Sequence, residues 1–471
     1  MSKEEYTSKV QFTILYIALG FVLLFQYSRA FNYEELFLFI ELMMSYIWTG
    51  GLLIYAKIRF NLKIFEPISI ITVIYEGIFI IKPIIDLRNH EMNEHGISVI
   101  DGGPKATLFF VIGYTVFFFS YYLTHKRITY NSHPLIKEEN TESEFTGNKL
   151  IIVYLSWIVV YTLCIYCMVS QGLTLKYIFS FGTEGLRSAD DSNTALLFLS
   201  NFGVTLVTLW VMILEYSKNI PIKVITTVLG IVYILMRNAR WLMLVFILAP
   251  IILFYLKRNK EPKIYWVLLV GLAGLTVFAW MQANRATLAS GGAMQGWGAE
   301  GFSLEALLAP LESDLSTYRT FYSMVTRFPT QYDFMLGTTF AYVFVLFIPR
   351  ALWGGKPDNP VRDMIEHSLN EKARTSGTAV ANIGECYANF GILGICVYMY
   401  IFGWIAASLK KYVFQPDYDS TKIRNRQIMY SILYPLFFQW IARGNFSGNF
   451  YLTIFALLPV LVPQVLKIIW K

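Results

Sequence analysis

The stretch "ECYANFGILGICVYMYIFGWIAAS" (residues 385–408) carries one charged side chain, Glu385 at its start. Apart from one asparagine, its other residues are apolar, aromatic or small. An α-helix rises about 1.5 Å per residue, so a helix of this length exceeds the hydrocarbon core of a bilayer, which is about 30 Å thick. The stretch therefore predicts a helix that crosses a membrane.

Similar apolar runs recur along the whole chain, which is 55% hydrophobic, 17% aromatic and only 15% charged, with a mean hydropathy of +0.48. A soluble globule of 471 residues would need more charge at its surface. A membrane barrel would show short strands of alternating polarity, and the sequence lacks this pattern. The predicted fold class is an all-α polytopic membrane protein with about twelve transmembrane helices. The runs lie at 11–28, 34–56, 65–85, 106–124, 150–170, 195–216, 220–236, 239–256, 265–282, 385–408, 428–442 and 449–468.

Lysine-rich segments follow alternate runs and orient the predicted helices. The positive-inside rule places these segments and both termini in the cytoplasm. Residues 283–384 then form a large external loop domain, whose run 339–349 predicts a short helix that does not cross the membrane. The chain thus divides into a bundle of about nine spans (1–282), the loop domain, and about three C-terminal spans (385–471). The lysine-rich segments are 57–63, 124–149, 217–223, 257–263 and 410–426.

Arginine gathers at the predicted outer ends of the helices, where the positive-inside rule does not require it. Arg237 and Arg240 are three residues apart at the junction of two runs and can face the same way. Guanidinium groups bind phosphate through paired hydrogen bonds, although a single arginine could also reach lipid headgroups. Because separate parts of the chain bring cations to one level, we expect a shared phosphate or pyrophosphate site. Its candidate ligands are Arg237, Arg240, Arg285, Arg350, Lys356 and Arg443.

Glu385 is the leading candidate for a proton acceptor near these cations. It lies between Gly384 and Gly391, with Asn382 and Asn389 nearby. It could act as a general base or bind a sugar hydroxyl, or it could only complement the dipole of its helix. The loop carboxylates that compete for this role are Asp314, Asp358, Asp363 and Glu366. Glu41, Glu66 and Glu76 fall within or at the edge of early runs, where we expect them to pair with hydroxyl groups or to form part of a conduit through the membrane.

Aromatic side chains of the loop domain and the following run could stack on sugar rings. Tryptophan and tyrosine are also ordinary anchors at the membrane interface, so each one singly fits either role. The candidates are Trp297, Tyr318, Tyr322, Trp353 and Tyr387.

Several kinds of site have no support in the sequence. We find no glycine-rich phosphate loop, no metalloprotease motif and no hydrolase elbow, and the histidines have no ligand spacing. The basic runs end membrane helices rather than line a groove with stacking aromatics. We therefore predict no metal, no cofactor and no nucleic acid.

Two stretches carry a resemblance to a known family. "FIPRALWGGKPDNP" (347–360), followed by "IGECYANFGILGI" (383–395), resembles the C-terminal signature of Wzy-type oligosaccharide repeat-unit polymerases, which include O-antigen and capsular polymerases. The resemblance implies a fold like that of the GT-C lipid-donor glycosyltransferases and a metal-independent transfer. The growing glycan would pass from undecaprenyl pyrophosphate to the terminal sugar of an incoming lipid-linked unit.

The same resemblance implies a place, partners and site residues. The reaction would occur at the outer face of the bacterial cytoplasmic (inner) membrane, with a chain-length regulator and a flippase as possible partners besides the bilayer. Carried onto this chain, the outer-face arginines that are a theme of the family correspond to Arg237, Arg240, Arg285, Arg350 and Arg443. Together with the reasoning from the residues above, this makes Glu385 and Arg350 the catalytic candidates, with Trp353 and Tyr387 as glycan contacts.

Two alternatives stay open at this point. An O-antigen ligase would share the layout but would use an external-loop histidine, for which only His367 is available. A flippase for lipid-linked oligosaccharides would show two related halves and cations in a central cavity rather than one large outer loop.

Overall fold

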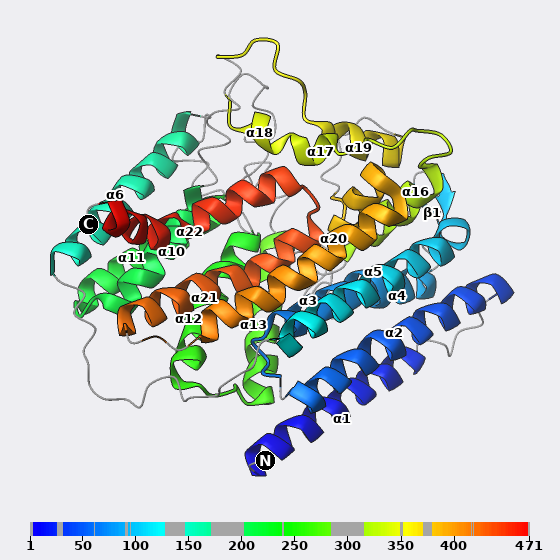
Figure 1. Ribbon diagram of the computed structural model, residues 1–471, viewed down its shortest axis with the longest axis horizontal. Coiled ribbons are helices and arrows are strands. Elements are labelled where there is room, and N and C mark those ends of the chain that lie inside the picture. The colour runs from blue at the N-terminus through cyan, green and yellow to red at the C-terminus, as the bar shows by residue number, and fades with distance from the viewer. Residues whose placement is uncertain are drawn as a thin grey trace.

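The computed structural model describes residues 3–25, 32–60, 62–89, 93–94, 96–127, 147–170, 202–237, 240–283, 315–348, 352–370, 379–415, 417 and 419–469. Within these ranges the chain is almost entirely helical (Figure 1). The strands are β1 (Asn93–Glu94) and β2 (Ile97–Ser98), which form a small antiparallel hairpin. The helices are α1 (Lys3–Phe25), α2 (Tyr33–Phe60), α3 (Pro67–Glu76), the π-helix η2 (Gly77–Ile81), α4 (Lys82–Arg88), α5 (Val99–Arg127), α6 (Gly147–Ser170), α10 (Gly203–Tyr216), α11 (Ile220–Arg237), α12 (Arg240–Arg258), α13 (Ile264–Ala283), α16 (Thr317–Arg327), α17 (Thr338–Ala341), α18 (Val343–Leu346), α19 (Pro360–Leu369), α20 (Asn382–Phe414), α21 (Ser420–Ala442) and α22 (Phe446–Ile469).

The all-α polytopic class is confirmed. Among the described residues, 6 helices are long and apolar enough to cross a membrane, and the described part of each expected apolar run lies largely in helix. The total of about twelve spans stays a prediction. The long helices are Tyr33–Phe60, Pro67–Arg88, Val99–Lys126, Lys149–Ser170, Trp241–Arg258 and Asn382–Phe414, and shorter apolar helices include Lys9–Phe25, Gly203–Tyr216, Ile220–Leu235, Tyr265–Trp280 and Phe446–Val462.

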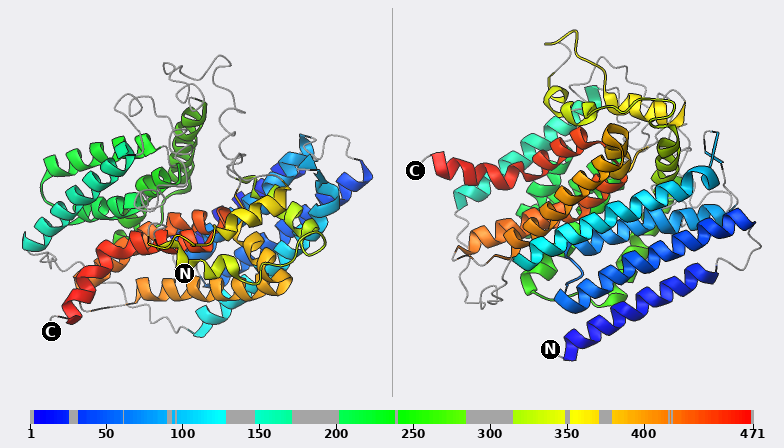
Figure 2. Two further views of the ribbon diagram at one scale, coloured as in Figure 1. Left: turned by 90° about the horizontal axis from the view of Figure 1, so that it is seen from above. Right: turned by 45° about the vertical axis from the view of Figure 1, so that its right-hand side comes forward.

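The helices pack around two apolar cores. One core is formed by the helices from α1 through α5 together with α16 and α20. The other is formed mainly by α6, α10, α12, α21 and α22. The views in Figure 2 show α1–α5 on one side of the molecule and α6–α12 on the other, with α20 and α21 between them. Helices α20 and α21 contribute to both cores and therefore hold the two halves together.

Close contact between α5 and α20 depends on small residues. A Cβ at Gly403 would lie 2.5 Å from the carbonyl oxygen of Phe117, and one at Gly113 would lie 2.7 Å from a methyl carbon of Ile395. Small residues at helix crossings let backbones approach closely, which is a common way for membrane helices to associate.

Two buried carboxylates of the early helices are paired. Glu76 accepts hydrogen bonds from the hydroxyls of Tyr16 and, at 2.8 Å, Thr49. Glu66 forms an ion pair with Lys410 of α20. Two of the early carboxylates thus have partners, as charges at membrane depth generally do.

The short helices between residues 317 and 369 lie together at the end of the bundle where α20 begins (Figure 1). The expected helix at 339–349 is two shorter helices, α17 and α18, which turn at Tyr342. Arg327, which we expect from sequence at the solvated surface, is instead buried, with 5% of its surface exposed. That expectation was wrong because α16 packs against α5, α19 and α20 and has little free surface.

Candidate active site

Helix α20 is broken near its start, and the break shapes the candidate site. Gly391 has φ +62° and ψ −150°, a conformation that favours glycine, and a Cβ there would also lie 3.1 Å from the ring of Phe334. The break frees backbone carbonyls of the first half-helix, and two backbone N–H groups bind them. Met335 N–H donates to the carbonyl of Ala388 at 2.9 Å, and Leu336 N–H donates to the carbonyl of Asn389 at 3.1 Å. Irregular backbone at membrane depth is tolerated where such partners exist.

Glu385 lies in this half-helix, almost fully buried with 2% of its surface exposed. Its Oε2 atom accepts a hydrogen bond from the backbone N–H of Phe446 at 2.9 Å, at the first residue of α22. Its Oε1 atom is buried and has no hydrogen-bond partner of ordinary geometry among the described residues. Burying an acceptor without a partner costs about 1–3 kcal/mol, so such groups mark sites with a purpose beyond packing.

Asn389, one turn after Glu385, connects three segments of the chain. Its Nδ2 group donates to the carbonyl of Glu385 at 2.7 Å and to the hydroxyl of Thr339 at 2.8 Å. Its Oδ1 atom accepts from Gly337 N–H at 2.9 Å, and Ser447 donates to the carbonyl of Thr339 at 2.7 Å. Residues 337–339, 385–389 and 446–447 therefore form one polar junction, which we call the outer junction after the face that the topology predicted from sequence gives it.

The loop between α21 and α22 brings Arg443 to the outer junction. The backbone N–H of Gly444 donates to the carbonyl of Val380, and a Cβ at Gly444 would lie 2.6 Å from the carbonyl oxygens of Val380 and Ala381. Only glycine fits here without a shift of the backbone. Arg443 is half-buried and directly precedes Gly444. Its backbone therefore lies close in space to Val380 and Ala381, a few residues before Glu385 in the chain.

A long apolar groove of about 1010 Å³ begins at the outer junction and follows α20. Asn389 and Phe446 line its head, and the rest is formed by apolar side chains of α20, α21 and α22 down to Leu409. At about 1.5 Å per residue, the path from Asn389 to Leu409 is roughly 30 Å, close to the thickness of a hydrocarbon core. The groove, here the α20 groove, can hold a long apolar chain whose polar head lies at the outer junction.

The other candidate residues lie in different places. Arg237 ends α11 and lies near the Cys164 and Cys167 thiols of α6. Arg240 begins α12, but its side chain lies outside the described residues. Arg285 and Arg350 lie wholly outside them, as do Trp297 and Asp314. Of the arginine set, Arg443 is the one that the described structure places in the loop whose residues Gly444 and Phe446 bond to Val380 and Glu385.

The remaining candidates make contacts within the protein. The ammonium group of Lys356 is buried and donates to the carbonyls of Leu346 at 3.0 Å and Ile348 at 2.8 Å, so it closes the loop that contains Arg350 in sequence. Tyr387 is buried and its hydroxyl donates to the carbonyl of Phe328 at 3.1 Å.

Exposure separates the other aromatic and loop candidates. Trp353 is 39% exposed, whereas Tyr318 and Tyr322 are buried in the core. Glu366 forms an ion pair with Arg362 at 3.2 Å.

Sequence reasoning missed Thr339, Ser447 and the α20 groove. A hydroxyl in an apolar run carries little signal, because serine and threonine commonly bond to their own helix. The groove depends on how three consecutive helices, α20, α21 and α22, diverge in space, which no local pattern encodes. Among the described residues, no group of three histidine, cysteine, aspartate or glutamate side chains could hold a metal ion.

Comparison with known proteins identifies the family. The sequence model described as O-antigen polysaccharide polymerase Wzy matches residues 11–471, nearly the whole chain. No curated protein and no solved structure matches it. The resemblance of the two C-terminal stretches is thereby confirmed, and the chain belongs to the O-antigen polysaccharide polymerase Wzy family.

Proposed function

We propose that this polymerase transfers the growing glycan from undecaprenyl pyrophosphate to the terminal sugar of an incoming lipid-linked repeat unit, at the outer junction. Family membership gives the general activity: a multi-pass membrane enzyme that polymerises lipid-linked O-antigen repeat units. The carrier lipid, the outer face of the bacterial inner membrane and the residues of the site are the parts that we propose.

The observation that carries the proposal is the position of the buried Glu385, which is one turn before Asn389 and bonded to Phe446, the two residues at the head of the α20 groove. An apolar channel of membrane length with a polar head suits a lipid-linked sugar, because the polyprenyl chain and the glycan need opposite environments. The donor chain would lie along α20, with its pyrophosphate and first sugar at the outer junction.

The proposed chemistry divides between Glu385 and the arginines. The acceptor hydroxyl attacks the anomeric carbon while the bond from that carbon to the pyrophosphate oxygen breaks. The hydroxyl proton passes to the Glu385 carboxylate, and the bonding electron pair leaves with the pyrophosphate. Fixed guanidinium groups stabilise this developing negative charge in a site with little water. We assign that role to Arg350 and Arg443, and pyrophosphate binding in general to Arg237, Arg240 and Arg285.

The remaining candidates take supporting roles. Lys356 holds together the two sides of the loop that carries Arg350. Trp353, exposed in the same loop, is the glycan contact that we favour. Residues 283–384 would form the external layer, above about twelve spans.

The test is polymerisation in vesicles that contain the purified protein and lipid-linked repeat units. We expect polymer from these units alone, and in cells we expect deletion to leave single units on their anchor. If the units of a deletion strain remain inaccessible to probes of the outer face, the chain transports units and does not polymerise them.

A further inference from the structure

Tyr332 and His367 form an aromatic stack among the short helices between residues 317 and 369, which Figure 1 shows at the end of the bundle where α20 begins. Their ring centroids lie 4.2 Å apart, and the rings are inclined by only 13°. The buried ring of Phe328 packs against both, at 6.0 Å from Tyr332 and 6.4 Å from His367. Both rings of the stack are nevertheless partly exposed. The apolar core thus holds an aromatic surface that a ligand can reach.

Hydrogen-bonding groups lie at the edge of this stack. The hydroxyl of Tyr332 donates to Oδ1 of Asn370 at 3.1 Å. Asn370 is exposed and ends α19 with φ +55°, a left-handed conformation that asparagine adopts more readily than most residues. The carboxamide also carries N–H donors, the phenol oxygen can accept, and a neutral imidazole has one donor and one acceptor. The stack and Asn370 therefore combine an aromatic face with donors and acceptors.

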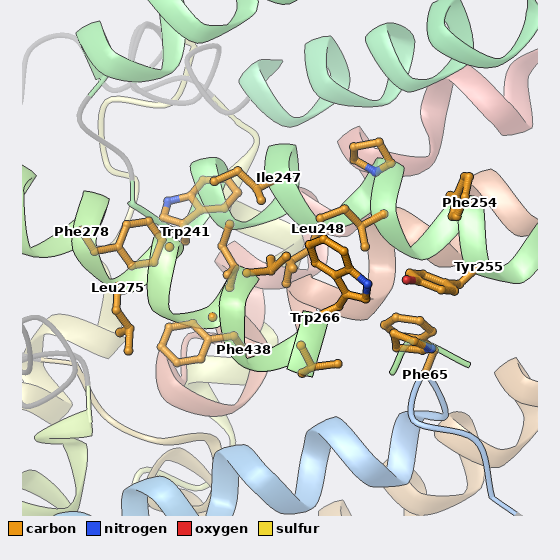
Figure 3. Close-up of a pocket in the computed structure, with 18 of the residues that line it drawn as sticks. Phe65, Trp241, Ile247, Leu248, Phe254, Tyr255, Trp266, Leu275, Phe278 and Phe438 are labelled. Carbon is orange, nitrogen blue, oxygen red and sulfur yellow. The ribbon is translucent and has the colours of Figure 1, made fainter. Parts of the chain in front are cut away.

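This combination suits a sugar ring, which has a face of C–H groups and hydroxyls that both donate and accept hydrogen bonds. A groove of about 790 Å³ in the membrane bundle shows the contrast. In Figure 3 its walls are apolar and aromatic side chains of α12 and α13, among them Trp241, Leu248 and Phe278. Hydroxyls buried against such walls would lose their hydrogen bonds to water, which costs free energy. The sugars of a lipid-linked substrate therefore belong at the end of the bundle that carries the stack.

The base of the stack is bonded to the half-helix that carries Glu385. The hydroxyl of Tyr387 donates to the carbonyl of Phe328 at 3.1 Å. Tyr387 follows Glu385 by two residues, which corresponds to about 200° around an α-helix. Phe328 is therefore bonded to the face of the half-helix opposite the Glu385 carboxylate. A sugar on the stack would belong to the same glycan as the reacting sugar without being the sugar that reacts.

We propose that the stack of Tyr332 and His367, together with Asn370, binds a sugar ring of the growing glycan away from the reacting bond. The inference rests on the function proposed above and adds a second sugar-binding place to the reaction site. The growing glycan fits better than the acceptor because it gains one unit in each turnover and must leave the bundle at this end. The sugars of the acceptor run back from the reacting hydroxyl to a lipid, so they lie on the membrane side.

Substitutions can separate the aromatic surface from the fold. Tyr332→Leu removes the ring and the hydroxyl but keeps an apolar side chain against Phe328. Tyr332→Phe keeps the ring and loses only the hydroxyl bond to Asn370. His367→Leu removes the other half of the stack and is the second variant. The matched control is Tyr33→Leu at the start of α2, where the tyrosine is 84% exposed, and thermal unfolding checks the fold of each variant.

The first measurement is binding of the glycan, released from its lipid and several repeat units long, to the purified protein. Saturation transfer from protein to sugar protons in NMR reports this binding. Wild type and Tyr33→Leu should bind the glycan equally, and Tyr332→Phe almost as well. In Tyr332→Leu and His367→Leu, the Kd should rise about tenfold, the effect of losing one aromatic contact. Equal affinity in Tyr332→Leu and wild type would overturn the proposal.

The second measurement assigns the stack to the growing glycan. With a donor that carries several repeat units, Tyr332→Leu should raise the KM for the donor about tenfold and leave kcat nearly unchanged, as loss of uniform binding does. The KM for the acceptor, a single lipid-linked unit, should keep its wild-type value, and the released polymer should be shorter. A KM that rises for the acceptor and not for the donor would give the stack to the incoming unit and would overturn the assignment.

Two further outcomes are informative. A loss of kcat in both Tyr332→Phe and Tyr332→Leu, with glycan binding intact, would show that the stack only supports the fold around Glu385 and would overturn the proposal. A wild-type protein that makes no polymer would overturn the proposed function, whereas a Tyr332→Leu protein that binds glycan and polymerises like wild type would overturn only the assignment of the stack.

Discussion

The carboxylate of Glu385 caps the start of α22 by accepting a hydrogen bond from the backbone N–H of Phe446 at 2.9 Å. The two residues are 61 positions apart, so this bond joins the half-helix of α20 to the last helix of the chain. One carboxylate oxygen thus has a structural partner, while the other is buried without a hydrogen bond among the described residues, one turn before the groove residue Asn389. Structural and chemical roles can therefore be separated by substitution.

Glu385→Gln should keep the fold and lose the reaction. The amide oxygen can still accept the bond from Phe446, but the amide cannot take a proton, so polymerisation should fall by about 10²–10⁴. The measurement is polymer formed per unit time at matched protein levels, with thermal unfolding as the check on the fold. Near-normal polymerisation by Glu385→Gln, together with a destabilised Glu385→Ala, would leave this carboxylate only its capping role.

The ion pair between Lys410 and Glu66 should matter for stability. It is buried, it joins α20 to the segment before α3, and His125 also contacts Lys410, at 3.0 Å. Lys410→Met would leave the Glu66 charge uncompensated and should destabilise the protein by about 3–5 kcal/mol. Adding Glu66→Gln should recover most of this loss, as measured by unfolding in detergent. If the double variant is no more stable than the single one, the two charges do not depend on each other.

Much of the helical architecture could be predicted from sequence because hydrophobic length is a local property. The described part of every predicted apolar run lies largely in helix, including the run that starts at Glu385. The break at Gly391 was not predicted, because a glycine in an apolar run has the same signature whether the helix continues or turns.

The candidate site was less predictable, since it depends on packing between distant segments. Arginine placement at helix ends pointed to Arg443, whose role stays a prediction. The hydrogen bond to the Glu385 carboxylate comes from residue 446, and Asn389 links the same turn to residue 339. The error at Arg327 has the same origin. The sequence of α16 mixes polar and aromatic residues and holds no long apolar run, whereas neighbours on several sides bury it.

The orientation of the chain can be tested by cysteine labelling. After replacement of the four native cysteines, Ser290→Cys and Ser376→Cys should react with a membrane-impermeant reagent in intact cells, because lysine placement puts 283–384 outside. Ser143→Cys, in the lysine-rich segment 124–149, is the matched control and should react only after permeabilisation. The opposite labelling pattern at all three sites would show that the chain has the inverse orientation in the membrane.

Polymerisation should continue in excess EDTA. Fixed arginines can neutralise a leaving pyrophosphate without a divalent cation, and they remain in place when chelator is added. The measurement is polymer yield in vesicles with and without EDTA, using a metal-dependent glycosyltransferase as the positive control for chelation. Loss of activity with rescue by magnesium or manganese would show that a metal takes the role that we assign to arginine.

Arg350→Lys tests whether an outer arginine binds pyrophosphate or only lipid headgroups. Lysine keeps the charge but loses the planar fork of the guanidinium, so a pyrophosphate ligand should lose much of its effect even in this conservative change. Removing one such contact from a developing charge costs about 2.7–4 kcal/mol, or roughly 10²–10³ in rate. An arginine that only reaches headgroups should tolerate the change.

The control for this substitution is Arg362→Lys in α19. Arg362 is partly exposed and pairs with Glu366 one turn later, at 3.2 Å, a contact that lysine can also make. Exposed pairs of this kind contribute only about 0.3–0.5 kcal/mol, so the control should polymerise at nearly the wild-type rate. The comparison uses polymer length and rate at matched protein levels. If Arg350→Lys behaves like Arg362→Lys, then Arg350 does not contact the leaving group, and the charge at the donor pyrophosphate must be balanced by Arg443 alone or by another cation of the loop domain.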